Sequence, residues 1–250
     1  QDGLLENTII FFYTDHGAGL PRAKRWIYDS GIRVPLIIRF PGASNAGAVT
    51  QELISTVDLA PTLLSLAGLP IPTHLQGQAF LGDAAAVDDR DYIYAARDRM
   101  IESYDYIRAV RDGQFKLIRN YDPSRPYIQP LQYRDQMNIM QELYRIDNEG
   151  TADPIQALWL ADSRPEYELY DLSKDPHEVN NLADDPAYAQ KFNELQAALD
   201  AWMVNVEGSA EPDVSDLPAA EQALINAGWP GGQQPTTATP ELTENSGSVA

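Results

Sequence analysis

The stretch that decides the fold is Asn7–Gly42, NTIIFFYTDHGAGLPRAKRWIYDSGIRVPLIIRFPG. Its first apolar run, Ile9–Tyr13, is β-branched and aromatic without polar alternation, which predicts a buried strand. The run leads to Asp15 and His16, and after a basic loop a second apolar run, Val34–Phe40, predicts another buried strand. Ligands of open α/β sheets bind at the carboxyl ends of the strands. A carboxylate and an imidazole at this point therefore indicate a binding site.

The chemistry of Asp15 and His16 allows two interpretations. A carboxylate offers hard oxygen to a divalent cation, and an imidazole nitrogen accepts Ca²⁺, Mn²⁺ or Zn²⁺. The pair then forms part of a metal site. In the alternative, the pair is a strand-end turn in which Asp15 bonds its own backbone and His16 is half-exposed.

Composition narrows the classes of function. The chain has 250 residues, enough for one large domain or two small ones, and a net charge of −19. Such acidity argues against nucleic-acid binding through a broad basic face and fits a secreted or periplasmic protein. No apolar run reaches the roughly 18–20 residues of a membrane span. The absence of cysteine excludes disulfides, thiolate metal sites and a cysteine nucleophile within these residues.

The rest of the chain predicts helices first and then a small sheet. TVDLAPTLLSL, residues 56–66, has apolar residues at helical spacing, with Gly68 as its C-cap. From Arg90 onward the sequence predicts short strands, two of them joined at Asp112-Gly113, a strong hairpin signal. These strand candidates are Tyr92–Ala96, Tyr106–Arg111, Phe115–Arg119 and Glu166–Leu172.

Helices are expected around this small sheet. Two are predicted near 134–146 and 152–161. A longer one follows Pro186, because Tyr188, Phe192, Leu195, Leu199 and Trp202 recur at amphipathic spacing. A short helix near 219–227 and a Pro-, Gly- and Thr-rich linker complete the chain.

Four separated stretches together resemble the type I, formylglycine-dependent sulfatase family of the alkaline-phosphatase superfamily. They are the segment 7–42 quoted above, VDLAPTLLSLAGLPIP (57–72), RAVRDGQFKLIRN (108–120) and LYDLSKDPHEVNNLA (169–183). The resemblance implies an α/β fold, an alkaline-phosphatase-like sheet followed by an α+β subdomain of antiparallel sheet and helices. It divides the chain into residues 1–88, the C-terminal part of the catalytic domain, 89–205, the antiparallel-sheet subdomain, and 206–250, an acidic helical extension and linker.

The resemblance also implies roles for individual residues. Asp15 and His16 would bind a divalent metal, Ca²⁺ in the first place, with Mn²⁺ or Zn²⁺ as alternatives. Lys24 would place a positive charge on the sulfate oxygens and stabilise the transition state; the alternative is a solvated surface lysine. In this family a Cys or Ser of a Cys-x-Pro-x-Arg or Ser-x-Pro-x-Arg motif becomes formylglycine, whose hydrate attacks sulfur.

This sequence departs from that pattern, because it contains no cysteine and no Ser-x-Pro-x-Arg. The nucleophile and about half of the metal ligands are therefore expected upstream of Gln1. We expect this chain alone to be inactive and the full-length protein to be a sulfuric ester hydrolase.

A sulfated carbohydrate is the expected substrate. His74, in the loop PTHLQGQAF, is a candidate contact to sugar or sulfate, with a surface histidine as the alternative. Arg97 and Arg99 follow the first strand of the small sheet and are candidates for bidentate bonds to sulfate or uronate. The alternative for these two arginines is an ion-pair cluster at the end of the strand.

Three tyrosines and two further functions complete the expectations. Tyr121, Tyr127 and Tyr133 are candidates for stacking on sugar faces, or else pack within the fold.

Within the same superfamily, His16 also suits a phosphodiesterase or a phosphonate monoester hydrolase. A non-catalytic binding protein that has lost the catalytic half is the third alternative.

Overall fold

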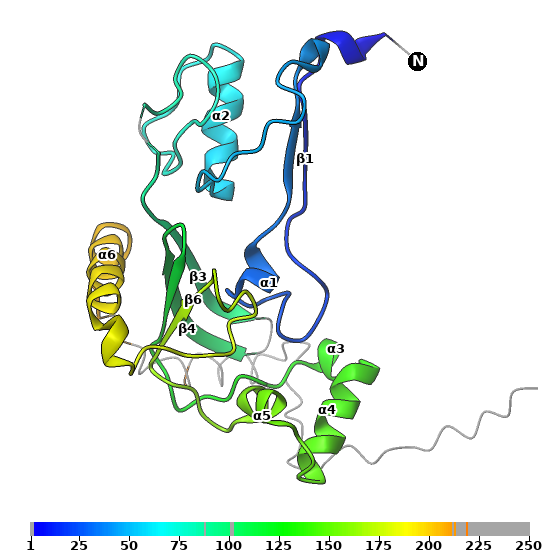
Figure 1. Cartoon of the computed structure of the whole chain (residues 1–250), viewed down its shortest axis with the longest axis vertical. Helices are drawn as coiled ribbons and strands as arrows, with labels where there is room; N and C mark the ends of the chain where they lie inside the picture. Colours follow the sequence, from blue (N-terminus) through cyan, green and yellow to red (C-terminus); the bar gives the residue numbers. More distant parts are fainter. Residues whose placement is uncertain (1–2, 88, 101–102, 212, 214–218, 220–250) are drawn as a thin grey trace, which may run out of the picture.

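The computed structural model describes residues 3–87, 89–100, 103–211, 213 and 219, and the helix expected near 219–227 lies almost entirely outside them. One end of the molecule holds β1 (Ile10–Tyr13), β2 (Leu36–Arg39) and α2 (Leu59–Leu66) (Figure 1). The other end holds a four-stranded sheet and the remaining helices. Single 3₁₀ turns occur at Leu4–Asn7, Pro41–Ala43, Thr56–Asp58 and Pro186–Tyr188.

Strands β1 and β2 form where the sequence predicts them, but the prediction that they are buried is wrong. They pair antiparallel with each other, Ile10 opposite Arg39, and no third strand joins them among the described residues. The exposed fractions of Phe12 and Ile37 are 59% and 60%. A strand is buried on both faces only when other layers cover the sheet, and a two-stranded ribbon leaves its apolar side chains in water.

The four-stranded sheet has the order β3-β4-β5-β6 and is antiparallel throughout. Its strands are β3 (Ile93–Met100), β4 (Ser103–Arg111), β5 (Phe115–Asn120) and β6 (Tyr167–Asp171). The predicted hairpin at Asp112 is confirmed: its Oδ1 accepts from the amides of Gln114 and Phe115 at 2.7 and 2.6 Å. An antiparallel sheet with helices, as the sequence predicts, is confirmed.

Strand β3 is longer than predicted. Its pairing with β4 continues beyond Ala96 through a bulge between Arg97 and Arg99. These two arginines therefore lie within the strand, whereas the sequence analysis placed them after it. The bulge is the physical reason, because it shifts the register and lets the strand continue.

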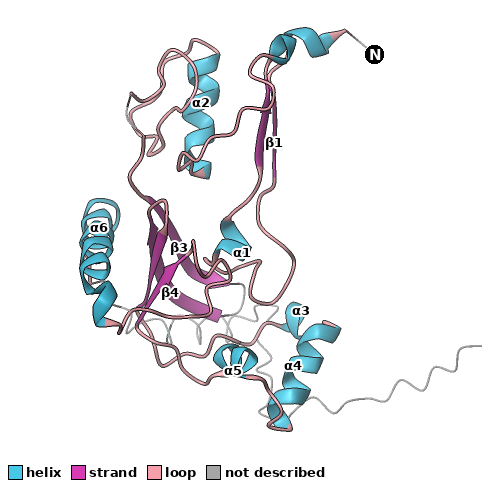
Figure 2. Ribbon diagram, viewed as in Figure 1, coloured by secondary structure: helices cyan, strands magenta, loops and turns pink. Residues whose placement is uncertain are grey.

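Helix α6 (Ala189–Glu207) covers one face of this sheet (Figure 2). Its buried face, Leu195, Leu199 and Met203, packs against Val110 and its neighbours on the sheet, which confirms the amphipathic helix predicted after Pro186. The ring of Trp202 stacks on Tyr94 with centroids 5.0 Å apart. Within the described residues, no helix combines the length and apolar character that crossing a bilayer requires.

The opposite face of the sheet is covered by a segment from the first part of the chain. Trp26, Ile27 and Tyr28 pack with Ile107 and Tyr170 of the sheet. Helix α1 (Asp29–Ile32) follows directly, and α3 (Gln132–Asp135), α4 (Asn138–Asn148) and α5 (Pro154–Leu160) lie beyond it. One hydrophobic core thus contains residues from both sides of position 88, and the division proposed there stays a prediction.

A buried ion triad joins this segment to the sheet. The Lys116 ammonium on β5 lies 2.6 Å from Asp29 Oδ1 and 2.8 Å from Glu178 Oε1, and it donates to the Ile27 carbonyl at 3.1 Å. The Asp29 amide donates to Glu178 Oε2 at 2.6 Å. Burial raises the pKa of the Glu178 carboxyl, and the Lys116 charge opposes that rise. The two carboxylates are compatible with burial because Lys116 lies between them and Arg111 Nη2 lies 3.6 Å from Asp29 Oδ2.

Lys116→Ala tests this triad. We expect the free energy of unfolding to fall by about 3–5 kcal/mol, because two buried carboxylates lose their shared cation. Urea denaturation of the wild type and the variant measures this loss.

The matched control is Arg145→Ala, which removes two ion pairs on the exposed surface of α4. Exposed pairs contribute little, so its loss is expected to be far smaller. Equal losses in the two variants would show that the buried triad has no special role.

Candidate functional site

The loop between β1 and β2 carries the residues that the sequence singled out. Its two ends are held together where the Gly17 amide donates to the Gly31 carbonyl at 2.8 Å. A Cβ on Gly17 would lie 1.9 Å from the Ser30 carbonyl oxygen, so only glycine permits this approach. Inside the loop, the Lys24 amide donates to the Ala18 carbonyl at 3.0 Å. The backbone thereby fixes the positions of Asp15 and Lys24 relative to each other.

Asp15 and His16 present two metal-ligand atoms side by side. His16 Nδ1 lies 2.7 Å from the Gly17 carbonyl oxygen, which can only accept, so Nδ1 is the donor and the tautomer with a proton on Nδ1 alone leaves Nε2 as an acceptor. Nε2 is 3.7 Å from Asp15 Oδ1. Because metal–ligand distances are about 2.0–2.6 Å, one cation fits between these two atoms. No group of three or more His, Cys, Asp or Glu side chains suited to a metal occurs among the described residues.

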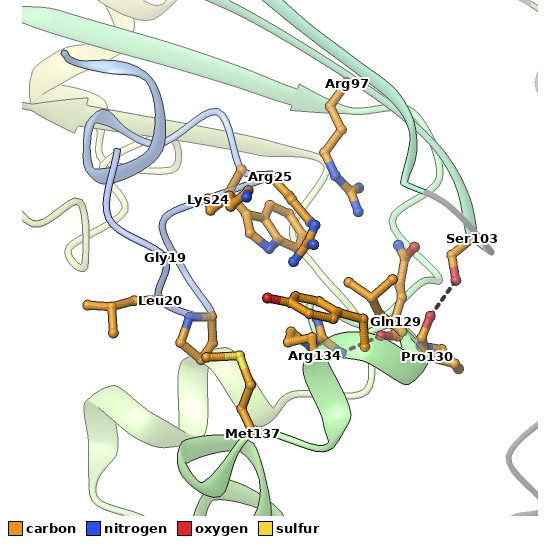
Figure 3. Close-up of a pocket in the computed structure, with 14 residues that line it drawn as sticks. Gly19, Leu20, Lys24, Arg25, Arg97, Ser103, Gln129, Pro130, Arg134 and Met137 are labelled. Carbon is orange, nitrogen blue, oxygen red and sulfur yellow. Dashed lines mark hydrogen bonds between the residues drawn. The ribbon is translucent and has the colours of Figure 1, made fainter. Parts of the chain in front are cut away.

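A pocket opens beside Lys24. Its wall is formed by the loop segment 19–26, by Arg97 of β3 and by the segment 129–137 before α4. Figure 3 shows Lys24, Arg25 and Arg97 gathered around this hollow, with Arg134 below them. The structure thus brings together Lys24 and Arg97, two of the residues predicted from sequence.

One buried carboxylate organises the wall of the pocket. Asp105 is fully buried and accepts two hydrogen bonds from Arg164, both at 2.8 Å, and one from Gln129 at 2.7 Å. It also pairs with Arg97, whose guanidinium lies 4.4 Å from the Trp26 ring centroid. Burial by itself raises the pKa of Asp105, but the hydrogen bonds and charges of Arg164 and Arg97 outweigh it and hold the pKa below its ordinary value. Two arginines share one carboxylate, so a net positive charge remains.

Arg134 is also neutralised within the wall. Its guanidinium donates to the Gln129 carbonyl at 2.5 Å and to Asp135 Oδ1 at 2.8 Å. Lys24 and Arg25 differ from Arg97 and Arg134, because neither side chain has an ion-pair partner within the described part of the chain. The backbone of Arg25 is left-handed, with φ at 76°, and its guanidinium lies 5.3 Å from the Tyr133 ring centroid.

The other predicted residues lie elsewhere. Arg99 is half-buried beside Tyr104, its guanidinium 5.1 Å from that ring centroid, and it does not line the pocket. His74 is exposed in the turn after α2 and also does not line it. Neither is tested as a substrate contact by this geometry, and both stay predictions.

The three tyrosines separate into two groups. Tyr127 is buried and stacked on Trp159, and Tyr121 packs edge-on against Tyr106, so the stacking role predicted for these two tyrosines is replaced by packing. Tyr133, with 66% of its surface exposed, lines the pocket and stays available to a ligand.

Sequence analysis missed Gln129, Asp105 and Arg134. They lie in no motif, and the nearest of them is 81 positions from Lys24 along the chain. The local signal was Asp105 itself, a carboxylate in strand β4 that has to find partners once it is buried.

Comparison with known proteins gives consistent results. A profile of the family described as "N-sulphoglucosamine sulphohydrolase, C-terminal" matches residues 21–158. An ulvan-active sulfatase of Formosa agariphila is 49% identical over 250 residues, all of this chain and 41% of that protein. The N-sulphoglucosamine sulphohydrolase of Homo sapiens is 29% identical over 217 residues, 80% of this chain and 42% of that protein.

The fold matches a solved structure of a protein in complex with its substrate D-glucosamine-2-N,6-O-disulfate. The TM-score is 0.60 at 27% identity, over 84% of this chain and 37% of that protein. The chain spans less than half the length of the curated relatives named here.

Gly17→Ala tests the closure of the loop. The new methyl group overlaps the Ser30 carbonyl, so we expect the free energy of unfolding to fall by about 1–3 kcal/mol. Gly19→Ala is the matched control, because a Cβ on Gly19 meets no atom within 4 Å. Thermal or urea unfolding of both variants decides: a loss as large in the control would remove the proposed reason for Gly17.

Asp105→Asn tests the buried carboxylate. At about pH 7 we expect a loss of about 3–5 kcal/mol in the free energy of unfolding, because Arg97 and Arg164 lose their shared anion. The folded pKa of Asp105 is lowered, so its contribution is complete above the ordinary pKa of 3.8 and is lost as pH falls through the folded value. The difference between wild type and variant should therefore shrink below about pH 4. A difference that is unchanged down to about pH 2 would contradict the pairing.

Proposed function

Because this chain belongs to the sulfatase family, we propose that the protein hydrolyses sulfate esters of a sulfated carbohydrate and that these residues form part of its active site. One observation carries the proposal. A single loop, closed at Gly17, carries the metal-ligand atoms of Asp15 and His16 and also Lys24. The ammonium of Lys24, which has no ion-pair partner among the described residues, belongs to the lining of a positively charged pocket, whereas Asp15 and His16 lie outside that lining. An acidic protein that keeps unpaired cations in one hollow is suited to an anionic ligand.

Asp15 and His16 would hold a divalent cation, and such a cation would supply Lewis-acid polarisation of a sulfate oxygen. The carboxylate favours Ca²⁺, and the imidazole also accepts Mn²⁺ or Zn²⁺. Their spacing of 3.7 Å fits one shared cation. The formylglycine nucleophile and the remaining ligands would come from residues outside these 250.

Lys24 would bind a non-bridging oxygen of the sulfate. Negative charge on these oxygens changes during attack on sulfur and departure of the alcohol, and a fixed cation stabilises that charge at small reorganisation cost. Lys24 suits this role because its backbone is fixed by Ala18 while its ammonium has no partner among the described residues.

The substrate is proposed from the pocket and from the relatives. Guanidinium groups and an exposed tyrosine suit a charged sugar. The similarity to an ulvan-active sulfatase supports a sulfated polysaccharide, and the net charge of −19 opposes nucleic acid as a partner. We also propose a secreted or periplasmic location, since a polysaccharide must be met outside the cytoplasm.

Substitutions in the full-length protein test this function. Lys24→Ala should lower kcat for sulfate release about 10²–10³-fold, the effect of losing one fixed charge at the transition state. Asp15→Asn should lower both the activity and the bound metal. Ion chromatography of sulfate released from ulvan and from sulfated glucosamine measures the activity, and elemental analysis measures the metal.

Lys174→Ala is the matched control, because this exposed lysine pairs with Asp171, away from the pocket. Its activity should equal that of the wild type. Faster turnover of phosphate diesters or phosphonate monoesters than of sulfate esters would favour the phosphodiesterase or phosphonate hydrolase alternative. Turnover of none of these esters by the full-length protein would favour the non-catalytic alternative.

A further inference from the structure

Two buried polar atoms in the wall of the pocket have no hydrogen-bond partner. They are Gln129 Oε1 and Arg97 Nε, on side chains that are 4% and 8% exposed. The Gln129 amide is held by its Nε2, which donates to Asp105 Oδ2 at 2.7 Å, so its oxygen stays an acceptor. Leaving a buried donor or acceptor without a partner costs about 1–3 kcal/mol. Gln129 also lines the pocket, so a hydroxyl group of a ligand that reached this oxygen would satisfy it.

Arg25 is the second observation. It adopts a left-handed backbone, φ 76°, which a non-glycine residue adopts at a cost and which is enriched at functional sites. This conformation accompanies a guanidinium that lies over the Tyr133 ring and has no acidic partner among the described residues. The chain has a net charge of −19, so carboxylates that could pair with an arginine are plentiful. An arginine that lines a pocket and has no ion-pair partner among the described residues is therefore suited to bind an anionic ligand.

Lys24 and Arg25 together supply more positive charge than the binding of one sulfate ester requires. In the proposed function, the scissile sulfate is bound by the metal and by Lys24. Arg25 is then left for a different group. A guanidinium forms paired hydrogen bonds with the planar edge of a carboxylate or with two sulfate oxygens. An exposed tyrosine ring covers the apolar face of a sugar.

We infer that Arg25, Tyr133 and Gln129 form a subsite for a second anionic group of the sugar ligand, a carboxylate or a further sulfate, next to the scissile sulfate. Arg25 binds the anion, Tyr133 supports the sugar ring, and Gln129 accepts from a hydroxyl. This inference rests on the proposed function for the position of the scissile sulfate. It assigns specificity to residues from two segments that are more than 100 positions apart in the sequence.

The test uses the full-length protein and four substrates, three of which form one comparison. They are a sulfated disaccharide with a uronate, the same disaccharide with its carboxylate reduced to an alcohol, and 4-nitrophenyl sulfate, which has no second anion. A disulfated glucosamine forms a fourth arm, for a second sulfate. The variant is Arg25→Asn, because asparagine tolerates the left-handed backbone and removes the charge.

Arg25→Asn should lower kcat/KM for the anionic disaccharide or the disulfated sugar about tenfold or more, the effect of losing a charged hydrogen bond. Turnover of 4-nitrophenyl sulfate should stay within about twofold. If the loss in kcat/KM occurs with the uronate disaccharide, the bound group is a carboxylate. If it occurs with the disulfated glucosamine, the bound group is a second sulfate. An equal loss on all substrates, or a wild type indifferent to both second anions, would overturn the inference.

Two further variants guard the interpretation. Tyr133→Ser alters an exposed side chain and should weaken the same substrates without lowering the melting temperature. Arg33→Asn changes an exposed arginine of the same loop that does not line the pocket, and should leave all rates unchanged.

If the wild type hydrolyses none of the substrates, the proposed function fails and the subsite is tested by binding alone. Titration calorimetry with the uronate disaccharide and with the disulfated glucosamine should then show about tenfold weaker binding of at least one to Arg25→Asn than to the wild type. Equal affinities of both proteins for both sugars would overturn the subsite independently of catalysis.

Discussion

The ammonium of Lys116 lies in the protein interior between the carboxylates of Asp29 and Glu178. Lys116 and Glu178 are almost fully shielded from water, so each depends on the opposite charges beside it. Asp29 is slightly exposed and also faces Arg111, whose Nη2 lies 3.6 Å from Asp29 Oδ2. Asp29 begins α1 directly after the loop that carries Lys24, and Glu178 belongs to the closing segment after β6. The triad therefore holds the loop, the sheet and the segment between β6 and the turn at Pro186–Tyr188 in one arrangement. A metal ligand or a catalytic cation needs such a fixed position to act on a substrate.

The pocket beside the loop combines cationic side chains that are paired with acceptors and cationic side chains that are not. Arg97, Arg164 and Arg134 are bound to carboxylates or carbonyl oxygens and give the wall its shape. Lys24 and Arg25 have no such partners among the described residues and are available to a ligand. This division explains how an acidic protein can receive an anion: the paired arginines build a rigid hollow, and the unpaired cations supply its net attraction. In the proposed function, the rigid wall would position a sulfated sugar and the unpaired cations would bind its anionic groups.

Local sequence patterns were sufficient for most of the fold. The hairpin at Asp112 follows from turn chemistry, and α6 follows from its apolar spacing. Asp15, His16 and Lys24 could be proposed from the sequence because they lie in one continuous segment. The exposure of β1 could not be predicted from its apolar sequence, because burial depends on whether other layers cover the sheet. The partners of Arg97 were not predictable either, since Asp105 and Arg164 meet it only through tertiary packing, and the register shift in β3 leaves no mark in the sequence.

The central claim is that Asp15 and His16 bind a divalent cation beside Lys24. Its most direct test is anomalous X-ray diffraction from crystals of the full-length protein soaked with Mn²⁺. The account predicts one anomalous peak within about 2.0–2.6 Å of Asp15 Oδ1 and His16 Nε2. A bound metal whose peak lies away from both side chains would contradict it.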